Sequence, residues 1–456
     1  MILIEVYLFL RKKDYKLKSL IIISCFFLVF CTSCSDDNKI IISTNSVAIE
    51  FVKTLGGSNN ESAKSIVRTS DGGYAVFGYT QSIDGDIITT SSAIQYDLWL
   101  LKFSADDTLQ WQKTFGGSKD DKGYKVIQTN DDGFVVTGFS KSIDGNVSAN
   151  EGFEDIWLLK LDTFGTIVWQ INTGFSGTDK GFSVTQTSDG GYFLGGILDV
   201  SASGGLGNKR QQRHAGGDFW GIKLSGNGTI EWRKYFGGTN TDTCYDVVET
   251  TNGYLMIGSS DSDDVDIKNN KGAYDVWVVK IDKTGTLLWE KSFGGSQTDE
   301  AYQIVKTNDN HFLLVGETSS TDKDVGNQNG GADIWVLKID TDGNIVWQKT
   351  FGGTHFDVGK SIKSTEDGGF LIAGNTRSLD KDITENKGNN DVWALKINSS
   401  GKLLWQKTVG GSDIDLAFDI VELSDNSIIV VGETSSNDKD IIQNKGFTDV
   451  LIVKLK

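Results

Sequence analysis

Residues 333–353 read DIWVLKIDTDGNIVWQKTFGG, and this stretch decides the fold. Apolar and polar residues alternate on both sides of the cluster Thr341-Asp342-Gly343-Asn344. Alternation with a period of two, interrupted by turn-forming residues, predicts two antiparallel strands joined by a tight turn. The aromatic residue of the second strand recurs as Phe51, Trp111, Trp169, Trp232, Trp289, Trp347 and Trp405. The spacings of 60, 58, 63, 57, 58 and 58 residues therefore indicate seven copies of one unit.

Each copy contains signals for four strands and none for a helix. In the fifth copy the strands are expected at Ala301–Thr307, Phe312–Thr318 and Asp333–Asp340, followed by the strand that holds Trp347. Seven such antiparallel units predict an all-β, seven-bladed β-propeller over residues 48–456, with an open solenoid as the alternative. The last unit ends at Lys456 without its fourth strand, and Ile49–Leu55 resembles the missing one. We therefore expect the N-terminal strand to close the ring.

Two series of small residues recur at fixed positions of the repeat. Glycine inside a strand marks the close approach of another group, and we expect the tryptophan of the neighbouring blade to be that group. These glycines are Gly78, Gly138, Gly196, Gly258, Gly316, Gly374 and Gly432. The second series starts the first strand of each unit, where seven strands converge on one axis. Its members are Ala63, Gly123, Gly181, Cys244, Ala301, Gly359 and Ala417.

The N-terminus reads as an export signal. Five basic residues between Arg11 and Lys18 precede the apolar run Leu20–Phe30, which is too short for a membrane span and fits a secretory signal. The following Cys31-Thr32-Ser33-Cys34 resembles the lipobox of bacterial lipoproteins, which implies cleavage after residue 33 and a lipid on Cys34. Asp36-Asp37 resembles the surface-export signal of some Gram-negative lipoproteins. We expect a signal peptide at 1–33, an acidic tether at 34–47, and a protein held on the outer membrane or cell surface by its lipid alone. An uncleaved anchor and a soluble secreted form are the alternatives.

Charge and cysteine content exclude several classes of protein. The net charge is −17. Removing residues 1–33, which hold five Lys/Arg and two Asp/Glu, changes it to −20. Such a surface repels phosphates, so nucleic acid is not an expected partner. The mature chain keeps Cys34 and Cys244, which gives no disulfide framework, and we expect a monomer held together by repeat packing.

The repeat resembles a known bacterial family. WQKTFGGSKDD at 111–121 and TSDGGYAVFGYT at 69–80 look like the bacterial β-propeller repeat family of secreted and surface proteins. The strand-turn-Trp element is similar to the tryptophan-docking motif of quinoprotein propellers. The resemblance covers residues 49–456 and implies a propeller outside the cytoplasm, without a defined activity.

Signals for an enzyme are weak. The three histidines, His214, His311 and His355, lie in different units, and no nucleophile elbow or P-loop is present. A polysaccharide-acting hydrolase or lyase built on the propeller is the alternative function. The favoured interpretation is a module that binds or scaffolds a protein or glycan.

Two acidic series are candidate sites. The first follows each aromatic position by ten residues and would ring one mouth of the central channel, or else cap turns. It comprises Glu61, Asp121, Asp179, Asp242, Asp299, Asp357 and Asp415. The second alternates in the long loops and suits Ca²⁺, with hydrogen bonding inside the loops as the alternative. Its members include Asp84, Asp86, Asp264, Asp266, Asp322, Asp324, Asp380, Asp382, Asp438 and Asp440.

One loop departs from the pattern in length and charge. Residues 201–217 read SASGGLGNKRQQRHAGG, five residues longer than the usual loop and without an acidic residue. Lys209, Arg210, Arg213 and His214 are therefore candidate ligand-binding residues, because a basic loop on an acidic face fits a carboxylate-bearing partner.

Overall fold

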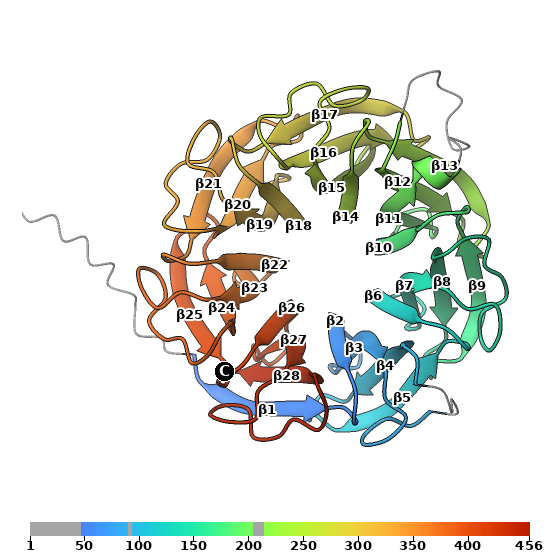
Figure 1. Cartoon of the computed structure of the whole chain (residues 1–456), viewed down its shortest axis with the longest axis vertical. Helices are drawn as coiled ribbons and strands as arrows, with labels where there is room; N and C mark the ends of the chain where they lie inside the picture. The colour runs from blue at the N-terminus through green and yellow to red at the C-terminus, as the bar shows by residue number, and fades with distance from the viewer. Residues whose placement is uncertain (1–46, 90–93, 204–213) are drawn as a thin grey trace, which may run out of the picture. The chain divides into compact units, whose positions relative to one another are not determined.

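The computed structural model describes residues 47–89, 94–203 and 214–456. These residues form seven separate four-stranded antiparallel sheets arranged around a central axis (Figure 1). The all-β, seven-bladed propeller predicted from the repeat is confirmed. The helical segment α1 (Val200–Ser203) lies in the third blade, and no described helix has the length and apolar character to cross a membrane.

We call the strands of each blade A to D from the axis outward. The A strands are β2 (Glu61–Arg68), β6 (Asp121–Gln128), β10 (Lys180–Gln186), β14 (Asp242–Thr250), β18 (Asp299–Lys306), β22 (Asp357–Ser364) and β26 (Asp415–Glu422). The B strands are β3 (Tyr74–Thr80), β7 (Phe134–Ser140), β11 (Tyr192–Asp199), β15 (Gly253–Ser260), β19 (Phe312–Thr318), β23 (Phe370–Thr376) and β27 (Ile428–Thr434).

The two outer positions complete each sheet. The C strands are β4 (Asp97–Phe103), β8 (Asp155–Leu161), β12 (Gly217–Leu224), β16 (Asp275–Asp282), β20 (Asp333–Ile339), β24 (Asp391–Ile397) and β28 (Asp449–Leu455). The D strands are β5 (Leu109–Phe115), β9 (Ile167–Thr173), β13 (Ile230–Phe236), β17 (Leu287–Phe293), β21 (Ile345–Phe351), β25 (Leu403–Val409) and β1 (Ile49–Leu55).

The first strand of the propeller closes the ring. β1 pairs antiparallel with β28, and the register brings Phe51 opposite Lys454 and Leu55 opposite Val450. Figure 1 shows the blue β1 alongside the red β28. The seventh blade therefore combines the two ends of the described chain, as the missing fourth strand predicted. Closure removes the free sheet edge that an open array would present.

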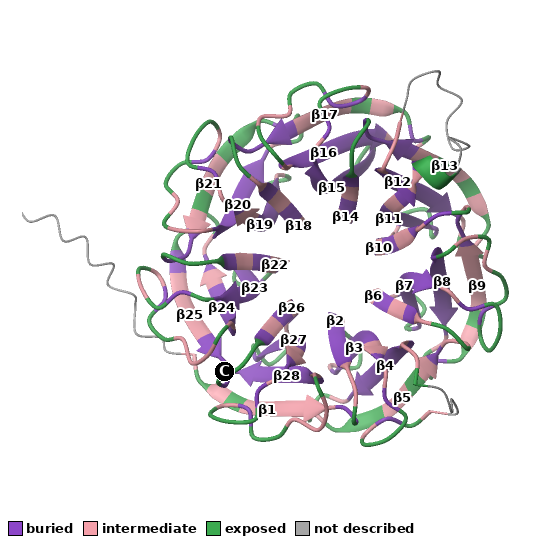
Figure 2. Ribbon diagram, in the orientation of Figure 1, coloured by how far each residue is buried: buried purple, intermediate pink, exposed green. Residues whose placement is uncertain are grey.

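Burial follows from the position of each strand in the blade. The B and C strands have apolar residues on both faces because neighbouring blades cover both, and they are buried along nearly their whole length. The D strands alternate between half-buried and exposed residues and form the rim (Figure 2). The core is thus a series of layers between blades rather than one central mass.

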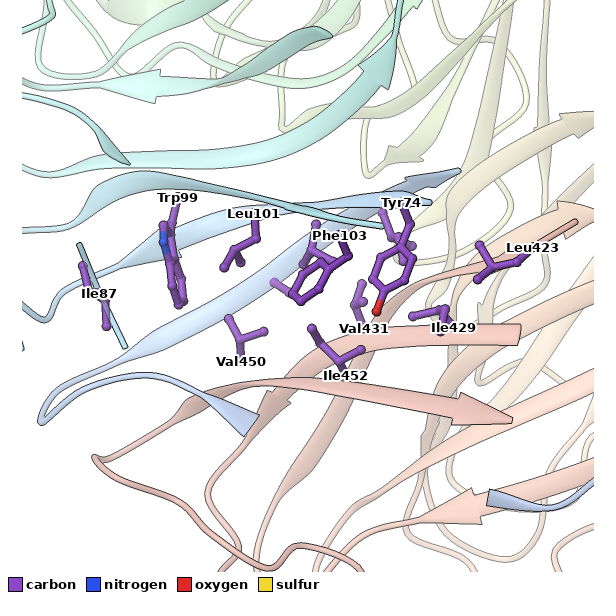
Figure 3. Close-up of a cluster of buried hydrophobic side chains, with 13 residues drawn as sticks. Tyr74, Ile87, Trp99, Leu101, Phe103, Leu423, Ile429, Val431, Val450 and Ile452 are labelled. Atoms are coloured by element: carbon purple, nitrogen blue, oxygen red, sulfur yellow. The ribbon is translucent and has the colours of Figure 1, made fainter. Parts of the chain in front are cut away.

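The junction of the first and seventh blades illustrates such a layer. Trp99 and Tyr74 of the first blade pack with Val431 and Ile452 of the seventh (Figure 3). The Trp99 indole is 1 % exposed, and its Nε1–H donates to Gln112 Oε1 at 2.9 Å. An apolar ring with one satisfied polar atom suits burial between two sheets.

The B-strand glycines meet a different neighbour from the predicted one. A Cβ atom on Gly78 would lie 1.9 Å from the carbonyl oxygen of Ser62, and its six counterparts meet the equivalent carbonyl. The pairing register shifts between Ala63 and Ser65, which pushes the A-strand backbone toward the glycine. The prediction that the neighbouring tryptophan fills this space is therefore wrong.

The D-strand tryptophans contact the next blade at a turn instead. A Cβ on Gly165, in the turn between β8 and β9, would lie 3.0 Å from the Trp111 ring of the preceding blade. The φ of Gly165 is +75°, a left-handed conformation that glycine adopts without strain. The preceding blade also limits the size of the small residues in the A strands. A Cβ on Gly123, for example, would lie 2.3 Å from the Phe77 ring.

Candidate functional site

The antiparallel meander gives the propeller two different faces. The B–C loops and the Gly-Gly turns that lead from D to A strands lie on one face, which we call the B–C face. The A–B and C–D turns lie on the other, the A–B face. In propellers the loops of a face carry function, because the strands are committed to packing.

The seven acids predicted to ring the channel mouth lie at the start of the A strands and are 0 % exposed. Six are the first residue of the strand, and Asp179 directly precedes β10. Each accepts the backbone N–H of the residue four positions earlier, at 2.7–2.9 Å. Asp299 also accepts the Ser320 hydroxyl at 2.8 Å. These contacts match the turn-capping alternative, and a role of the acids in ligand binding stays a prediction.

A second buried carboxylate faces each of these acids at the blade junction. A Cβ on Gly352 would lie 2.4 Å from Asp333 Oδ1 and 2.9 Å from Asp357 Oδ2, so the two carboxyl groups meet over this glycine. Asp333 is 0 % exposed, and its Oδ1 has no hydrogen-bond partner among the described residues. Burial, and then the charges of Asp357 and Asp382, raise the pKa of Asp333 to about 7.

This carboxyl pair recurs at the blade junctions. The C-strand members are Asp97, Asp155, Asp218, Asp275, Asp333, Asp391 and Asp449, and burial is the largest cause of the raised pKa of each. Seven repeats of one arrangement indicate a structural element. A shared proton removes the repulsion between two buried carboxylates, so these groups bind protons more tightly in the folded state.

The Asp-x-Asp loops fold back on the Gly-Gly turns. Asp322 Oδ1 accepts the Ser296 N–H at 2.8 Å, and Asp324 Oδ2 accepts the Gly294 N–H at 3.2 Å and pairs with Lys271. Equivalent bonds form at Asp84, Asp86, Asp264, Asp266, Asp380, Asp382, Asp438 and Asp440. Among the described residues, no three His, Cys, Asp or Glu side chains gather as metal ligands. Calcium binding here stays a prediction.

The basic loop falls largely outside the described residues. Lys209, Arg210 and Arg213 lie in the segment 204–213, so their role stays a prediction. His214 is described, and its side chain is 2 % exposed. Its Nδ1 lies 2.6 Å from Asp218 Oδ2, and its ring packs edge-on against Tyr235 at a centroid distance of 4.9 Å. These contacts hold His214 at the base of the loop, and its role in ligand binding stays a prediction.

The blades also differ at the fourth position of the A strand, counted from each of the channel-mouth acids. Rings from consecutive A strands contact one another, with centroid distances of 5.0 Å for Tyr124–Phe182, 5.7 Å for Phe182–Tyr245 and 5.2 Å for Tyr245–Tyr302. Lys360 Nζ then lies 3.3 Å from the Tyr302 ring centroid. In the remaining two blades, Lys64 Nζ lies 3.3 Å from the Phe418 ring centroid. We call these seven residues the aromatic–lysine belt.

One position further along the A strand, polar side chains link the blades. Asp419 Oδ2 accepts from the Ser65 hydroxyl and the Ile66 N–H at 3.1 and 3.0 Å. Its Oδ1 lies 2.6 Å from Ser361 Oγ and 3.2 Å from Lys363 Nζ. Burial opposes ionisation, but the nearby lysines lower the pKa of Asp419. The contacts around Asp419 therefore tie the first, sixth and seventh blades together near the axis.

The belt continues into a pocket of the sixth blade on the B–C face. A cavity of about 210 Å³ is lined by Phe356, Val358, Lys360, Asn375, Arg377 and Asn390. Phe356 is 52 % exposed, which makes its ring a platform at the surface. Among the described residues, no carboxylate oxygen lies within 4.0 Å of the cationic nitrogens of Lys360 or Arg377. At the equivalent positions of the first two blades, Lys64 and Lys141 are paired with acids.

Sequence reasoning missed the belt and this pocket. The fourth A-strand position lies three residues after each acid, and its sequence Lys, Tyr, Phe, Tyr, Tyr, Lys, Phe differs from blade to blade. A search for positions that vary within an otherwise faithful repeat would have found it.

Comparisons with known proteins give distant matches. No family model matches the chain. The regulatory protein FlaEY of Caulobacter vibrioides is 22 % identical over 406 residues, which cover 80 % of this chain and 41 % of that protein. The chain thus spans less than half the length of this relative.

Solved structures are also distant in sequence. The Pan2 WD40 domain of Neurospora crassa aligns over 89 % of this chain and 95 % of its own, with 9 % identity and a TM-score of 0.44. A putative 6-phosphogluconolactonase of Bacteroides uniformis aligns over 79 % of this chain and all of its own, with 12 % identity and a TM-score of 0.41. The fold therefore rests on the seven sheets described above.

Proposed function

We propose that this protein is a binding module that takes a protein or glycan partner on its B–C face. The observation that carries the proposal is the sixth-blade pocket, where no carboxylate oxygen of the described residues lies within 4.0 Å of the cationic nitrogens of Lys360 and Arg377. The charges of Glu300 and Glu317 act on Lys360 from further away. In a chain of net charge −17, two such cations beside an exposed aromatic ring favour a partner that bears carboxylates. The belt extends the same surface toward the axis.

The asymmetry of this surface supports a binding role. Near-identical loops would offer any partner seven similar contacts, whereas the belt and the pocket distinguish one blade from the next. Aromatic and arginine side chains dominate the energetics of many interfaces. A partner seated on the sixth blade would contact Phe356 and Arg377 first and reach the belt through Lys360.

The test replaces Lys360 and Arg377 together by Gln. Capture is measured on an array of acidic and neutral glycans and by pull-down from an extracellular protein fraction. We expect the double variant to lose at least tenfold in capture while its melting temperature stays within about 2 °C. Lys141→Gln, at the position of the second blade that is equivalent to Arg377, is the matched control. Equal capture by the parent and the Lys360/Arg377 variant would contradict the proposal.

The basic loop is the second part of the proposed surface. Lys209, Arg210 and Arg213 supply positive charge beyond the described residues, and a carboxylate-bearing partner would pair with them. Replacing all three by Ser should reduce capture with little change in melting temperature. Combining these changes with the sixth-blade pair shows whether the two regions serve one partner, because contacts to one partner produce non-additive losses.

The surface location is proposed from the N-terminal sequence. Cys34 follows the apolar run at the lipobox position, and the acids after it resemble an export signal. Metabolic labelling with palmitate should mark the parent and leave Cys34→Ala unlabelled. Protease added to intact cells should then digest the propeller of the parent, whereas protection of the propeller would place it on an inner surface.

A further inference from the structure

A lysine recurs on the C strand of every blade, and in six of them it has an acidic partner. It is buried in each blade except the sixth, where Lys396 is half-buried. The six Nζ–carboxylate distances lie between 2.6 and 3.0 Å. The pairs are Lys102–Asp71, Lys160–Asp131, Lys223–Asp189, Lys338–Asp309, Lys396–Asp367 and Lys454–Asp107. In the first five pairs the acid belongs to the A–B turn of the same blade. Pairing of this kind offsets the cost of removing the ammonium group from water.

The fourth blade lacks this acid. Its A–B turn reads Thr250-Thr251-Asn252-Gly253, one residue shorter than the Thr69-Ser70-Asp71-Gly72-Gly73 of the first blade and without an aspartate. Lys280 occupies the recurrent C-strand position and is 4 % exposed. Its Nζ donates to Thr250 Oγ1 at 2.5 Å. Within the described residues no carboxylate oxygen lies within 4.0 Å of it.

An ammonium group has three N–H donors, and among the described residues Thr250 Oγ1 is the one acceptor seen for Lys280. Burial, and then the charges of Lys283 and Lys306, lower the pKa of Lys280 to about 8. The ammonium form is disfavoured there in the absence of a nearby anion.

A cavity opens at this corner, between the fourth and fifth blades on the A–B face. Its volume is about 480 Å³, and its lining includes Lys280, Asn252, Trp289, Lys306, Phe312 and Asp342. The counterpart between the fifth and sixth blades measures about 270 Å³ and contains the Lys338–Asp309 pair. The cavity with the unpaired lysine is thus the larger of the two and falls within the size range of small-molecule sites.

We propose that this cavity binds a small molecule bearing a carboxylate, which takes the place of the missing aspartate on Lys280. The indole of Trp289 and the ring of Phe312 offer an apolar wall for the body of the ligand. Lys306 is exposed and adds positive charge, whereas Asp342 is exposed on the C–D turn of the fifth blade. The site lies on the face opposite the sixth-blade pocket, so it is independent of the proposed partner surface.

The test uses 4-fluorophenylacetate as the probe and 4-fluorophenylacetamide as its uncharged counterpart. Binding is followed by ¹⁹F NMR line broadening below pH 7, where Lys280 is protonated. We expect the acid to bind the parent protein and the amide to bind at least tenfold more weakly. Lys280→Met should weaken binding of the acid at least tenfold, because the methionine keeps the packing and removes the charge.

Lys338→Met is the matched control, since it removes the equivalent lysine where an aspartate is present. It should leave binding of the acid unchanged, and circular dichroism checks that each variant is folded. Equal binding of acid and amide, unchanged binding to Lys280→Met, or equal loss in Lys338→Met would each overturn the proposal.

Discussion

The junction between the fourth and fifth blades and the junction between the fifth and sixth blades differ at the partner of the C-strand lysine. Both have a buried C-strand lysine and a wall formed by the next blade, but only the second has an aspartate at the A–B turn. The repeat therefore specifies the structure of each blade. Where the fourth blade differs from the repeat, the missing aspartate leaves Lys280 without an acidic partner among the described residues. We expect residues that recur in every blade to determine stability, and residues that differ in one blade to determine binding.

The largest expected effect is on a recurrent feature, the four-stranded blade. Deleting Ile49–Leu55 leaves β28 as an open edge and uncovers part of the seventh-blade core. We expect the free energy of unfolding to fall by several kcal/mol, measured by urea denaturation. A truncated protein that melts at the parent temperature would contradict closure by β1.

The second effect concerns the recurrent carboxyl pairs and pH. Asp97, Asp275 and Asp333 have pKa values of about 7, above the ordinary value of 3.8. The folded state thus binds more protons than the unfolded state between pH 4 and 7, so stability decreases as pH rises through this window. We expect the melting temperature to be several degrees higher at pH 5 than at pH 8.

The variant Asp333→Asn checks that these groups cause the pH effect. The amide keeps the shape and removes one ionisation, so stability at pH 8 should increase and the difference between pH 5 and pH 8 should shrink. Asp342→Asn, at an exposed turn position, is the control. A pH profile identical in all three proteins would assign the effect to other groups.

The third effect compares the two junctions directly. Lys338→Met breaks a pair with a 2.6 Å contact and should lower the free energy of unfolding by about 1–2 kcal/mol, within the range of partly buried ion pairs. Lys280→Met removes a buried ammonium without an acidic partner among the described residues, so stability should stay the same or rise. Chemical denaturation of both variants at pH 7 measures the difference. Equal destabilisation by the two substitutions would contradict the proposed difference between the two junctions.

The smallest effect is expected in the Asp-x-Asp loops. Asp322 accepts one backbone N–H at 2.8 Å in an exposed loop, so Asp322→Asn should cost less than about 1 kcal/mol. On the basis of these hydrogen bonds alone, EDTA should leave the melting temperature unchanged within about 1 °C. A clear fall with EDTA that added Ca²⁺ reverses would instead support the calcium prediction.

The sequence predicted the features that depend on periodicity. Blade number and strand order follow from the spacing of Trp111 and its counterparts, because a repeated hydrophobic pattern permits few packings. Closure by Ile49–Leu55 follows from the fourth strand that the last unit lacks. The neighbour of Gly78 was predicted wrongly, since a register shift within the sheet leaves little trace in a single repeat. Asn252 stands in the sequence where other blades have an aspartate. The consequence for Lys280 could not be predicted, because the sequence does not show that Lys280 lies beside that turn. Contacts between the strands of one blade are not encoded by the period itself.

The closing pair of strands also sets the order of folding. Phe51 lies opposite Lys454, so the seventh blade needs segments from the two ends of a chain about 400 residues apart. The first six blades can each form from contiguous sequence, but the last must wait until synthesis has delivered β28. Until then β1 has no partner strand, and contacts at such separation form slowly. Completion of the ring is therefore a late step of folding, because it requires the whole propeller sequence through β28.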